Sequence, residues 1–188
     1  MKDECTKGLN RLTDGLLEFL SSKGIAKLLK QGVKMKVLLD FDGVMVTTPV
    51  WRPVEQLNDG FMRFNDTCAQ NLAEILEKTQ ADIVLTTTHR IHYDNETWRE
   101  LLYNRGITTN LVTKVNGAAK FTELSDRCEE VLEWIANHPN ENFVIIDDDK
   151  SLLGLPDKLK ARWVETDFHS GLTAELKKQA LDILFLKR

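Results

Sequence analysis

Two aspartates spaced by one residue follow an apolar run near the start of the chain. The segment Val37–Val44 reads VLLDFDGV, which places Asp40 and Asp42 between apolar residues and a glycine. Side chains on a strand alternate between its faces, so the two carboxylates should share one pocket. Two anions this close raise each other's pKa unless a cation or a proton intervenes. The pattern therefore predicts a metal site or an acid/base pair, and the alternative is a strand that ends in a solvated acidic turn.

Two more polar clusters follow apolar runs further along. Segment 86–90 (TTTHR) comes after IVL, and segment 147–150 (DDDK) comes after VII. Hydroxyls, backbone amides and a basic side chain suit the oxygens of a phosphate, and acids from two strand ends suit an oxygen-ligated Mg²⁺. Taken singly, each cluster also fits a strand end or a solvated loop. Together they predict a phosphate bridged to the protein by Mg²⁺.

A basic residue at the start of a predicted helix is the third signal. Asp126 followed by Glu129 is typical of a helix start, which places Arg127 in the first turn. The helix dipole disfavours a cation there, so we expect an anionic partner such as the clustered aspartates and an incoming phosphate. Lys114 and Lys120 are competitors for this role, and an arginine paired only with a neighbouring glutamate or with solvent is the alternative.

Strands and helices must alternate to bring these groups together. Short β-rich apolar runs predict strands at 36–41, 82–86, 109–113, 142–147 and 161–165. Amphipathic stretches predict helices at 60–79, 95–105, 126–137 and 173–186. Such alternation favours an α/β fold, a three-layer doubly wound parallel sheet. Ligands bind such sheets beyond the carboxyl ends of the strands, where all the polar clusters would lie.

Composition bounds the class of protein. The chain has 188 residues, a formal net charge of -4 and a pI near 5.6, which does not favour broad nonspecific binding to nucleic acid. No apolar run reaches the length of a membrane span, and we expect no secretion signal at the N-terminus. Three cysteines without metal-ligand spacing suggest free thiols, so we expect a cytoplasmic protein. We expect a helical extension at 1–34 and one domain at 35–188.

The motifs resemble, in order, those of the haloacid dehalogenase (HAD) superfamily of aspartate-nucleophile phosphohydrolases. The matching segments are Asp40–Val44, Thr86–Thr88, Arg127 and Ile145–Asp149, and the resemblance covers residues 35 to 186. It implies a HAD-like fold, and the short segment after the first motif leaves no room for a full cap domain. An uncapped site would admit a macromolecular phosphate, such as a nucleic-acid end, as well as a small phosphoester.

Within the superfamily the chain is similar to the small HAD domains of bacterial RNA-repair (Swiss Army Knife) proteins. The similarity rests on the segments Leu85–Arg90, Trp98–Leu102 and Gly171–Thr173 together with Arg127. His89 stands where those relatives tend to have tryptophan, and threonines replace serines. The substrate preference of the subfamily therefore cannot be carried over.

The resemblance also implies a mechanism. Asp40 would attack phosphorus to form an aspartyl phosphate, and Asp42 would protonate the leaving oxygen and then activate water. Asp40, the backbone carbonyl of Asp42 and a carboxylate of the fourth motif, Asp148, would hold Mg²⁺. Asp147 would orient Arg127 or a metal-bound water.

The remaining polar residues would contact the substrate. Thr86 or Thr87 would hydrogen-bond the transferring phosphoryl group, and Thr88 and Arg90 would contact the substrate phosphate. His89 and His92 are interpreted as surface or packing residues, because an oxygen-rich acidic site selects magnesium over zinc.

Two alternatives to a phosphatase belong to other classes of protein. One is a non-catalytic HAD-fold module that binds phosphate or acts as a scaffold. The other is a signalling receiver domain, which phosphorylates a lone aspartate at the end of a middle strand. The strand ends at 86 and 113 carry threonine, which argues against the receiver.

Overall fold

The computed structural model describes residues 34–47 and 51–186. From Met35 onward the chain forms one compact unit, and the fold below is the fold of that unit. The helical extension expected at 1–34 lies outside the described residues except for Lys34.

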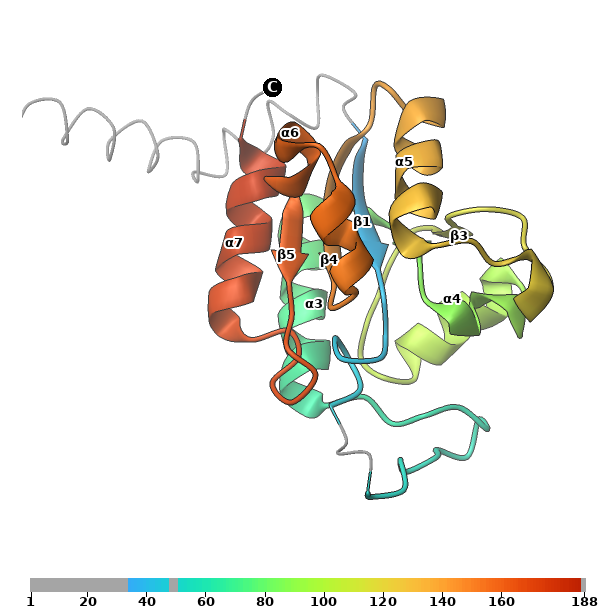
Figure 1. Ribbon diagram of the computed structural model, residues 1–188. Coiled ribbons are helices and arrows are strands. Elements are labelled where there is room, and N and C mark those ends of the chain that lie inside the picture. Colours follow the sequence, from blue (N-terminus) through green and yellow to red (C-terminus); the bar gives the residue numbers. More distant parts are fainter. Residues whose placement is uncertain (1–33, 48–50, 187–188) are drawn as a thin grey trace, which may run out of the picture. The chain divides into compact units, whose positions relative to one another are not determined.

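A five-stranded parallel sheet forms the centre of this unit (Figure 1). Its strands, in chain order, are β1 (Met35–Leu39), β2 (Asp82–Leu85), β3 (Val112–Lys114), β4 (Asn142–Asp147) and β5 (Trp163–Glu165). The order across the sheet is β3-β2-β1-β4-β5, and every neighbouring pair is parallel. Because β1 lies between β2 and β4, the winding of the chain reverses at β1, which makes its carboxyl end the expected place for a ligand.

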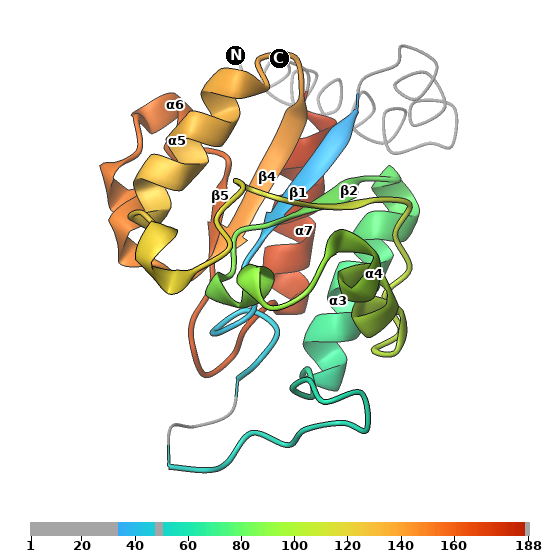
Figure 2. The same cartoon turned by 90° about the vertical axis from the view of Figure 1, so that its right-hand side faces the viewer.

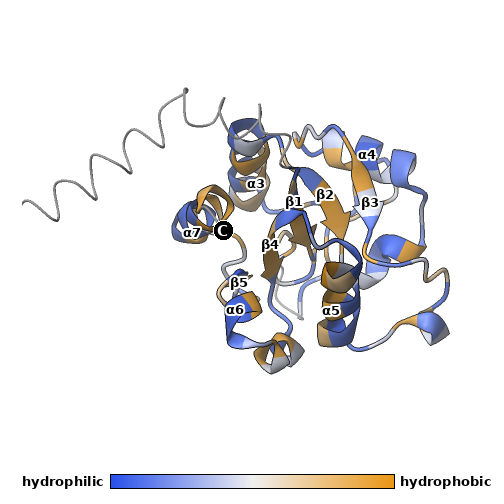
Figure 3. Ribbon diagram, turned by 90° about the horizontal axis from the view of Figure 1, so that it is seen from above, coloured by the Kyte–Doolittle hydropathy of each residue, from blue (hydrophilic) through white to orange (hydrophobic). Residues whose placement is uncertain are grey.

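Helices cover both faces of the sheet, as the view from above shows (Figure 3). One face carries α3 (Asp66–Thr79), α4 (Asn95–Tyr103) and α7 (Ala174–Phe185). The other carries α5 (Arg127–Asn137) and α6 (Asp157–Lys160), which Figure 2 shows together. Short 3₁₀ helices η1 (Thr88–Ile91), η2 (Phe121–Glu123) and η3 (Lys150–Gly154) complete the unit. The structure confirms the predicted α/β doubly wound fold.

The central strands are buried along their whole length, as expected for parallel strands between two layers of helices. On the α5 face, Leu38 and Ile145 pack in one cluster with Val131 and Trp134. Helix α5 begins where its sequence indicates, because the Asp126 carboxylate accepts a hydrogen bond from the Cys128 backbone N–H (2.9 Å). This cap fixes the position of the first turn of α5 at the edge of the site.

The helix expected at 60–79 begins later, at Asp66. The side chain of Asn65 caps the helix by accepting from two backbone N–H groups, and Gly60 has a positive φ of 79°, which is incompatible with helix. Phe61 and Phe64, which lie at helical spacing, instead pack from a loop against Phe41. Tertiary packing of the aromatic rings therefore overrides the helical pattern here.

The third strand is shorter and later than the run at 109–113 suggests. The strand includes only Val112–Lys114, and Leu111, which precedes it, is about half-exposed. The described residues between β1 and β2 form a loop and α3, and they include no inserted cap domain. In the described part of the chain, no helix is long and apolar enough to cross a membrane.

Candidate active site at the carboxyl ends of β1, β2 and β4

Strand pairing brings the three polar clusters to one edge of the sheet. The Asp40 backbone N–H donates to Ile146 O of β4 (3.1 Å), and the Thr86 N–H donates to Leu39 O of β1 (2.9 Å). The carboxyl ends of these adjacent strands therefore lie side by side. Asp40 follows β1, Thr86 follows β2 and Asp147 is the last residue of β4. The sequence prediction that these clusters lie at one edge is confirmed.

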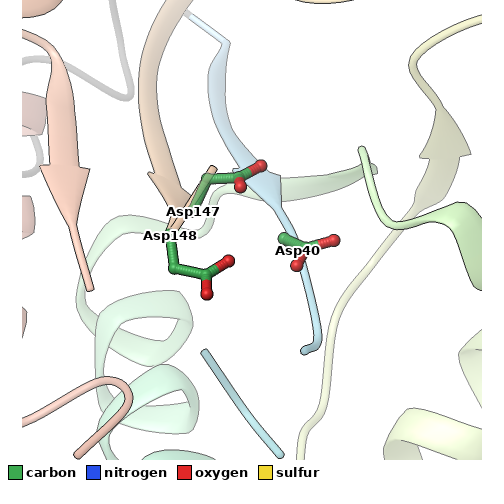
Figure 4. A group of neighbouring side chains, drawn as sticks. All are labelled: Asp40, Asp147 and Asp148. Atoms are coloured by element: carbon green, nitrogen blue, oxygen red, sulfur yellow. The ribbon is translucent and has the colours of Figure 1, made fainter. Parts of the chain in front are cut away.

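Three carboxylates converge there (Figure 4). Ligand oxygens of Asp40, Asp147 and Asp148 all lie within 4.8 Å of one another. Asp147 is fully buried, Asp40 is nearly so, and Asp148 is half-buried. Because Asp40 and Asp148 directly follow two different strands and lie more than a hundred residues apart in the chain, the convergence is a product of the fold.

Gly43 makes this arrangement possible, although its place in the sequence indicates no role beyond a turn. Its φ is +68°, and a Cβ at this position would overlap the carboxylate of Asp148. Only glycine fits a position with both constraints. A glycine directly after two acids at a strand end was the available signal.

Arg127 is the cation of the site. Its guanidinium pairs with Asp147 and lies 3.3 Å from Asp40 Oδ1. It also donates to the hydroxyl of Thr86 (3.3 Å), which itself donates to Asp147 Oδ2 (3.2 Å). Burial lowers the pKa of Arg127, but the charges of Asp147 and Asp40 more than offset this, and the pKa rises above its usual value. Arg127 therefore remains charged among the acids.

The two lysines considered as competitors lie elsewhere. Lys114 is the last residue of β3, and Lys120 precedes η2 on the surface. Within residues 34–47 and 51–186, the ion pairs to Asp40 and Asp147 come from Arg127 alone.

The arginine does not fully compensate the clustered negative charge. Burial and the charge of Asp147 raise the pKa of Asp40 to about 8, with Asp42 and Asp148 adding to the effect and Arg127 opposing it. Burial and the charge of Asp147 also raise the pKa of Asp148. Both shifts favour the protonated form of the carboxyl relative to an exposed aspartate, and further positive charge next to the cluster would oppose them.

The residues present fit a hard divalent cation. The cluster offers carboxylate oxygens from three side chains, the donor type that Mg²⁺ prefers. The glycine at 43 leaves room where a side chain would displace Asp148. The side chain of Asp42 does not join this cluster, since its carboxylate faces His89, and only its backbone carbonyl remains as an expected ligand.

The three threonines occupy different environments. Thr86 is buried in the network around Asp147. Thr87 is also buried, and its Oγ1 accepts a hydrogen bond from the His89 backbone N–H (3.4 Å) at the start of η1. Thr88 is exposed, in the first turn of η1.

Arg90 differs from the expectation of a substrate contact. It is fully buried, and its guanidinium pairs with Glu130 of α5 and donates to Asn116 Oδ1 (3.2 Å). It also donates to the carbonyls of Thr86 and Thr87 (2.8 and 3.0 Å). This geometry assigns Arg90 to the support of the threonine segment instead of to the substrate.

His89 is a second residue, after Gly43, whose role in the site could not be predicted from the sequence. Its Nε2 lies 3.0 Å from Asp42 Oδ2, so it contacts the acid/base candidate directly. The unusual histidine after the threonines was the signal, but nothing in the sequence indicated the contact partner.

A comparison of the sequence with protein families agrees with the fold and with the acid cluster. A family model described as the HAD domain in Swiss Army Knife RNA repair proteins matches residues 36–176. The matched span runs from β1 into α7 and includes every residue of the acid cluster. No curated protein shows a significant match to the chain.

Proposed function

This chain belongs to the family of HAD domains in Swiss Army Knife RNA repair proteins, and on that premise we propose that it is a Mg²⁺-dependent phosphatase that acts on a phosphomonoester through an aspartyl phosphate. One observation carries the proposal, the convergence of Asp40, Asp147 and Asp148 beside the guanidinium of Arg127. Buried acids around a cation site, next to a fixed positive charge, suit the transfer of a phosphoryl group.

Asp40 and Asp42 divide the chemistry between them. A carboxylate oxygen of Asp40 forms a bond to phosphorus while the bond from phosphorus to the leaving oxygen breaks. Asp42 gives its proton to the leaving oxygen and then takes one from the water that attacks the aspartyl phosphate. Inorganic phosphate leaves, and both aspartates return to their starting states.

The surrounding residues hold the acids and the phosphoryl group. Bound at Asp40, Asp148 and the Asp42 carbonyl, Mg²⁺ would neutralise negative charge on the phosphoryl oxygens. Arg127 fixes Asp147 and one oxygen of Asp40, leaving the other oxygen of Asp40 for attack. The Thr87 hydroxyl already accepts from a backbone N–H, so its own proton is available to a phosphoryl oxygen, with Thr88 at the entrance.

The substrate is a phosphomonoester, either a small molecule or the phosphorylated end of a macromolecule. Support for the larger class comes from the described residues around the acids, which include no inserted domain over the strand ends.

Phosphate release from 4-nitrophenyl phosphate in the presence of Mg²⁺ tests the proposal. Asp40→Asn preserves shape and removes the nucleophile, so we expect the rate to fall at least about a thousandfold. Asp157→Asn, an equal change at the exposed start of α6, should leave the rate unchanged. Full activity in the Asp40 variant would contradict the mechanism. Tight binding of inorganic phosphate by a parent protein that turns over no ester would favour the non-catalytic module.

A further inference from the structure

The carboxylate of Asp42 is held from one side. Its Oδ2 lies 3.0 Å from Nε2 of His89. Among the described residues, no other side chain or backbone group forms a hydrogen bond with this carboxylate. The side chain of Asp42 is 51% exposed, so little else restrains its rotation. An unrestrained exposed carboxylate would sample several rotamers, of which few suit proton transfer.

His89 is itself fixed in place. Its ring packs edge-on against Phe61, with the ring centroids 5.6 Å apart, and Phe61 is buried. Its backbone N–H donates to the Thr87 hydroxyl, and its carbonyl accepts from the His92 N–H (3.0 Å). The donor that reaches Asp42 is therefore held by both the ring packing and the 3₁₀ turn of η1.

One bound oxygen leaves the other available. With Oδ2 engaged by His89, Oδ1 of Asp42 can exchange a proton with a group bound next to Asp40. The two aspartates are close enough that the charge of Asp42 raises the pKa of Asp40. A support of this kind, which orients an acid/base group without touching the substrate, is how catalytic side chains are held in productive geometry.

We infer that His89 is a positioning residue that orients the Asp42 carboxylate for proton transfer to the leaving oxygen and from the attacking water. This inference rests on the proposed phosphatase function and adds to it. In the step concerned, a carboxylate oxygen of Asp40 forms a bond to phosphorus, the bond from phosphorus to the leaving oxygen breaks, and that oxygen receives the proton of Asp42.

The inference makes the effect of His89 depend on the leaving group. Proton donation speeds the reaction most when the leaving oxygen is strongly basic, and it has little effect on the departure of the weakly basic 4-nitrophenolate. Phenyl phosphate has nearly the same shape as 4-nitrophenyl phosphate and a poorer leaving group. Binding contributes about equally to kcat/KM for two esters of nearly the same shape, so the ratio of the two kcat/KM values isolates the effect on proton transfer.

His89→Phe keeps a ring against Phe61 and removes the donor. We expect kcat/KM for phenyl phosphate to fall about tenfold or more, and kcat/KM for 4-nitrophenyl phosphate to fall less than about threefold. His89→Gln, whose amide nitrogen can reach Asp42, should restore most of the loss. His92→Phe is the matched control, since His92 lies beside His89 while the hydrogen bond to Asp42 comes from His89, and it should leave both values unchanged.

Equal losses for the two esters, no loss for either, or a glutamine variant as impaired as the phenylalanine variant would each overturn the inference. Thermal unfolding shows whether His89→Phe folds, and His89→Leu replaces it if it does not. A parent protein without activity on either ester would instead contradict the proposed function, so the two failures are distinguishable.

Discussion

At the scale of single residues, the site depends on the close approach of two backbone segments. The turn after β1 and the loop after β4 meet where Gly43 faces Asp148. A methyl group at this position would have to displace a carboxylate that we propose as a metal ligand. The glycine is therefore as much a part of the site as the acids.

Gly43→Ala should weaken both the fold and the binding of Mg²⁺. The positive φ alone costs about 1–2 kcal/mol with a side chain, and the overlap with Asp148 would displace the carboxylate that we propose as a ligand of Mg²⁺. Chemical denaturation measures the first effect, and a Mg²⁺ titration followed by calorimetry measures the second.

Gly60→Ala is the matched control. Gly60 has a similar φ of +79°, but a Cβ there meets nothing within 4 Å. The control should lose stability to a similar extent and bind Mg²⁺ as the parent does. If the two variants bind Mg²⁺ equally well, then the contact with Asp148 does not matter for the site.

At the scale of elements, a buried ion pair joins η1 to α5. Glu130 lies one turn after Arg127 on α5 and pairs with Arg90, which also holds the carbonyls of the threonine segment. The helix that supplies the cation of the site is thereby tied to the segment that supplies its hydroxyls. Both side chains are almost completely buried.

Breaking this pair from one side should be costly. Arg90→Met leaves Glu130 buried without its cation, and we expect a loss of about 3–5 kcal/mol in the free energy of unfolding. Replacing both residues with apolar ones should cost less than replacing Arg90 alone, because no charge stays buried and unpaired. Urea denaturation of the parent, the Arg90 variant and the double variant measures the two losses in the free energy of unfolding. Equal losses in the two variants would contradict the prediction.

An exposed pair serves as the reference for that prediction. Arg99 pairs with Glu96 on the surface of α4, with 47% and 65% of the side chains exposed. Arg99→Met should change the free energy of unfolding by no more than about 0.5 kcal/mol.

A second ion pair fastens the loop that precedes α3. Both oxygens of Asp59 accept from the guanidinium of Arg105 (2.8 and 3.1 Å), which also donates to Met62 O (2.8 Å). The same guanidinium lies over the rings of Phe61 and Phe64. The loop that supports His89 through Phe61 is thus held by Arg105.

This pair should contribute stability that depends on pH. Hydrogen bonding to Arg105 lowers the pKa of Asp59 to about 2 in the folded protein, below the value of 3.8 expected when unfolded. Its contribution is therefore complete above about pH 4 and is lost as the pH falls through about 2. We expect Asp59→Asn to cost about 1–2 kcal/mol at pH 7 and progressively less below pH 4, measured by urea denaturation across that range. A difference that does not change with pH would contradict the assignment.

At the scale of the whole molecule, a cation bound as proposed at the acid cluster would couple its binding to folding. Asp40 directly follows β1, and Asp147 and Asp148 lie at and just after the end of β4, so only the folded chain assembles them. A cation that binds the folded state alone stabilises it by about 2.7 kcal/mol at a hundred times its dissociation constant. The same acids repel one another while no cation is bound.

Mg²⁺ should therefore raise the melting temperature of the parent protein. Asp148→Asn should abolish most of this rise. Without metal the variant should be at least as stable as the parent, because a charge is no longer partly buried at this position and the repulsion with Asp147 is relieved. Differential scanning calorimetry with Mg²⁺ and with a chelator measures both changes. An equal rise in parent and variant would show that Mg²⁺ binds elsewhere.

Patterns within short segments account for what could be predicted. Apolar runs located the strands, and the start of α5 followed from Asp126, because strand burial and helix capping are set by neighbouring residues. The prediction of a helix from residue 60 was wrong over 60–65. Phe61 and Phe64 have helical spacing there, but they pack on Phe41 from a loop. The periodicity of a short segment carries no information about a packing partner that lies elsewhere in the chain.

The same division applies to the site. By itself the sequence determined the fold class, the acidic and hydroxyl groups at the strand ends, and the type of cation they suit. Only the tertiary structure decided that Arg127 serves as the cation, that Arg90 supports the threonines, and that His89 reaches Asp42. Asp40 and Arg127 are 87 residues apart, and side chains so distant meet only through the register of the sheet and the packing of α5 against it.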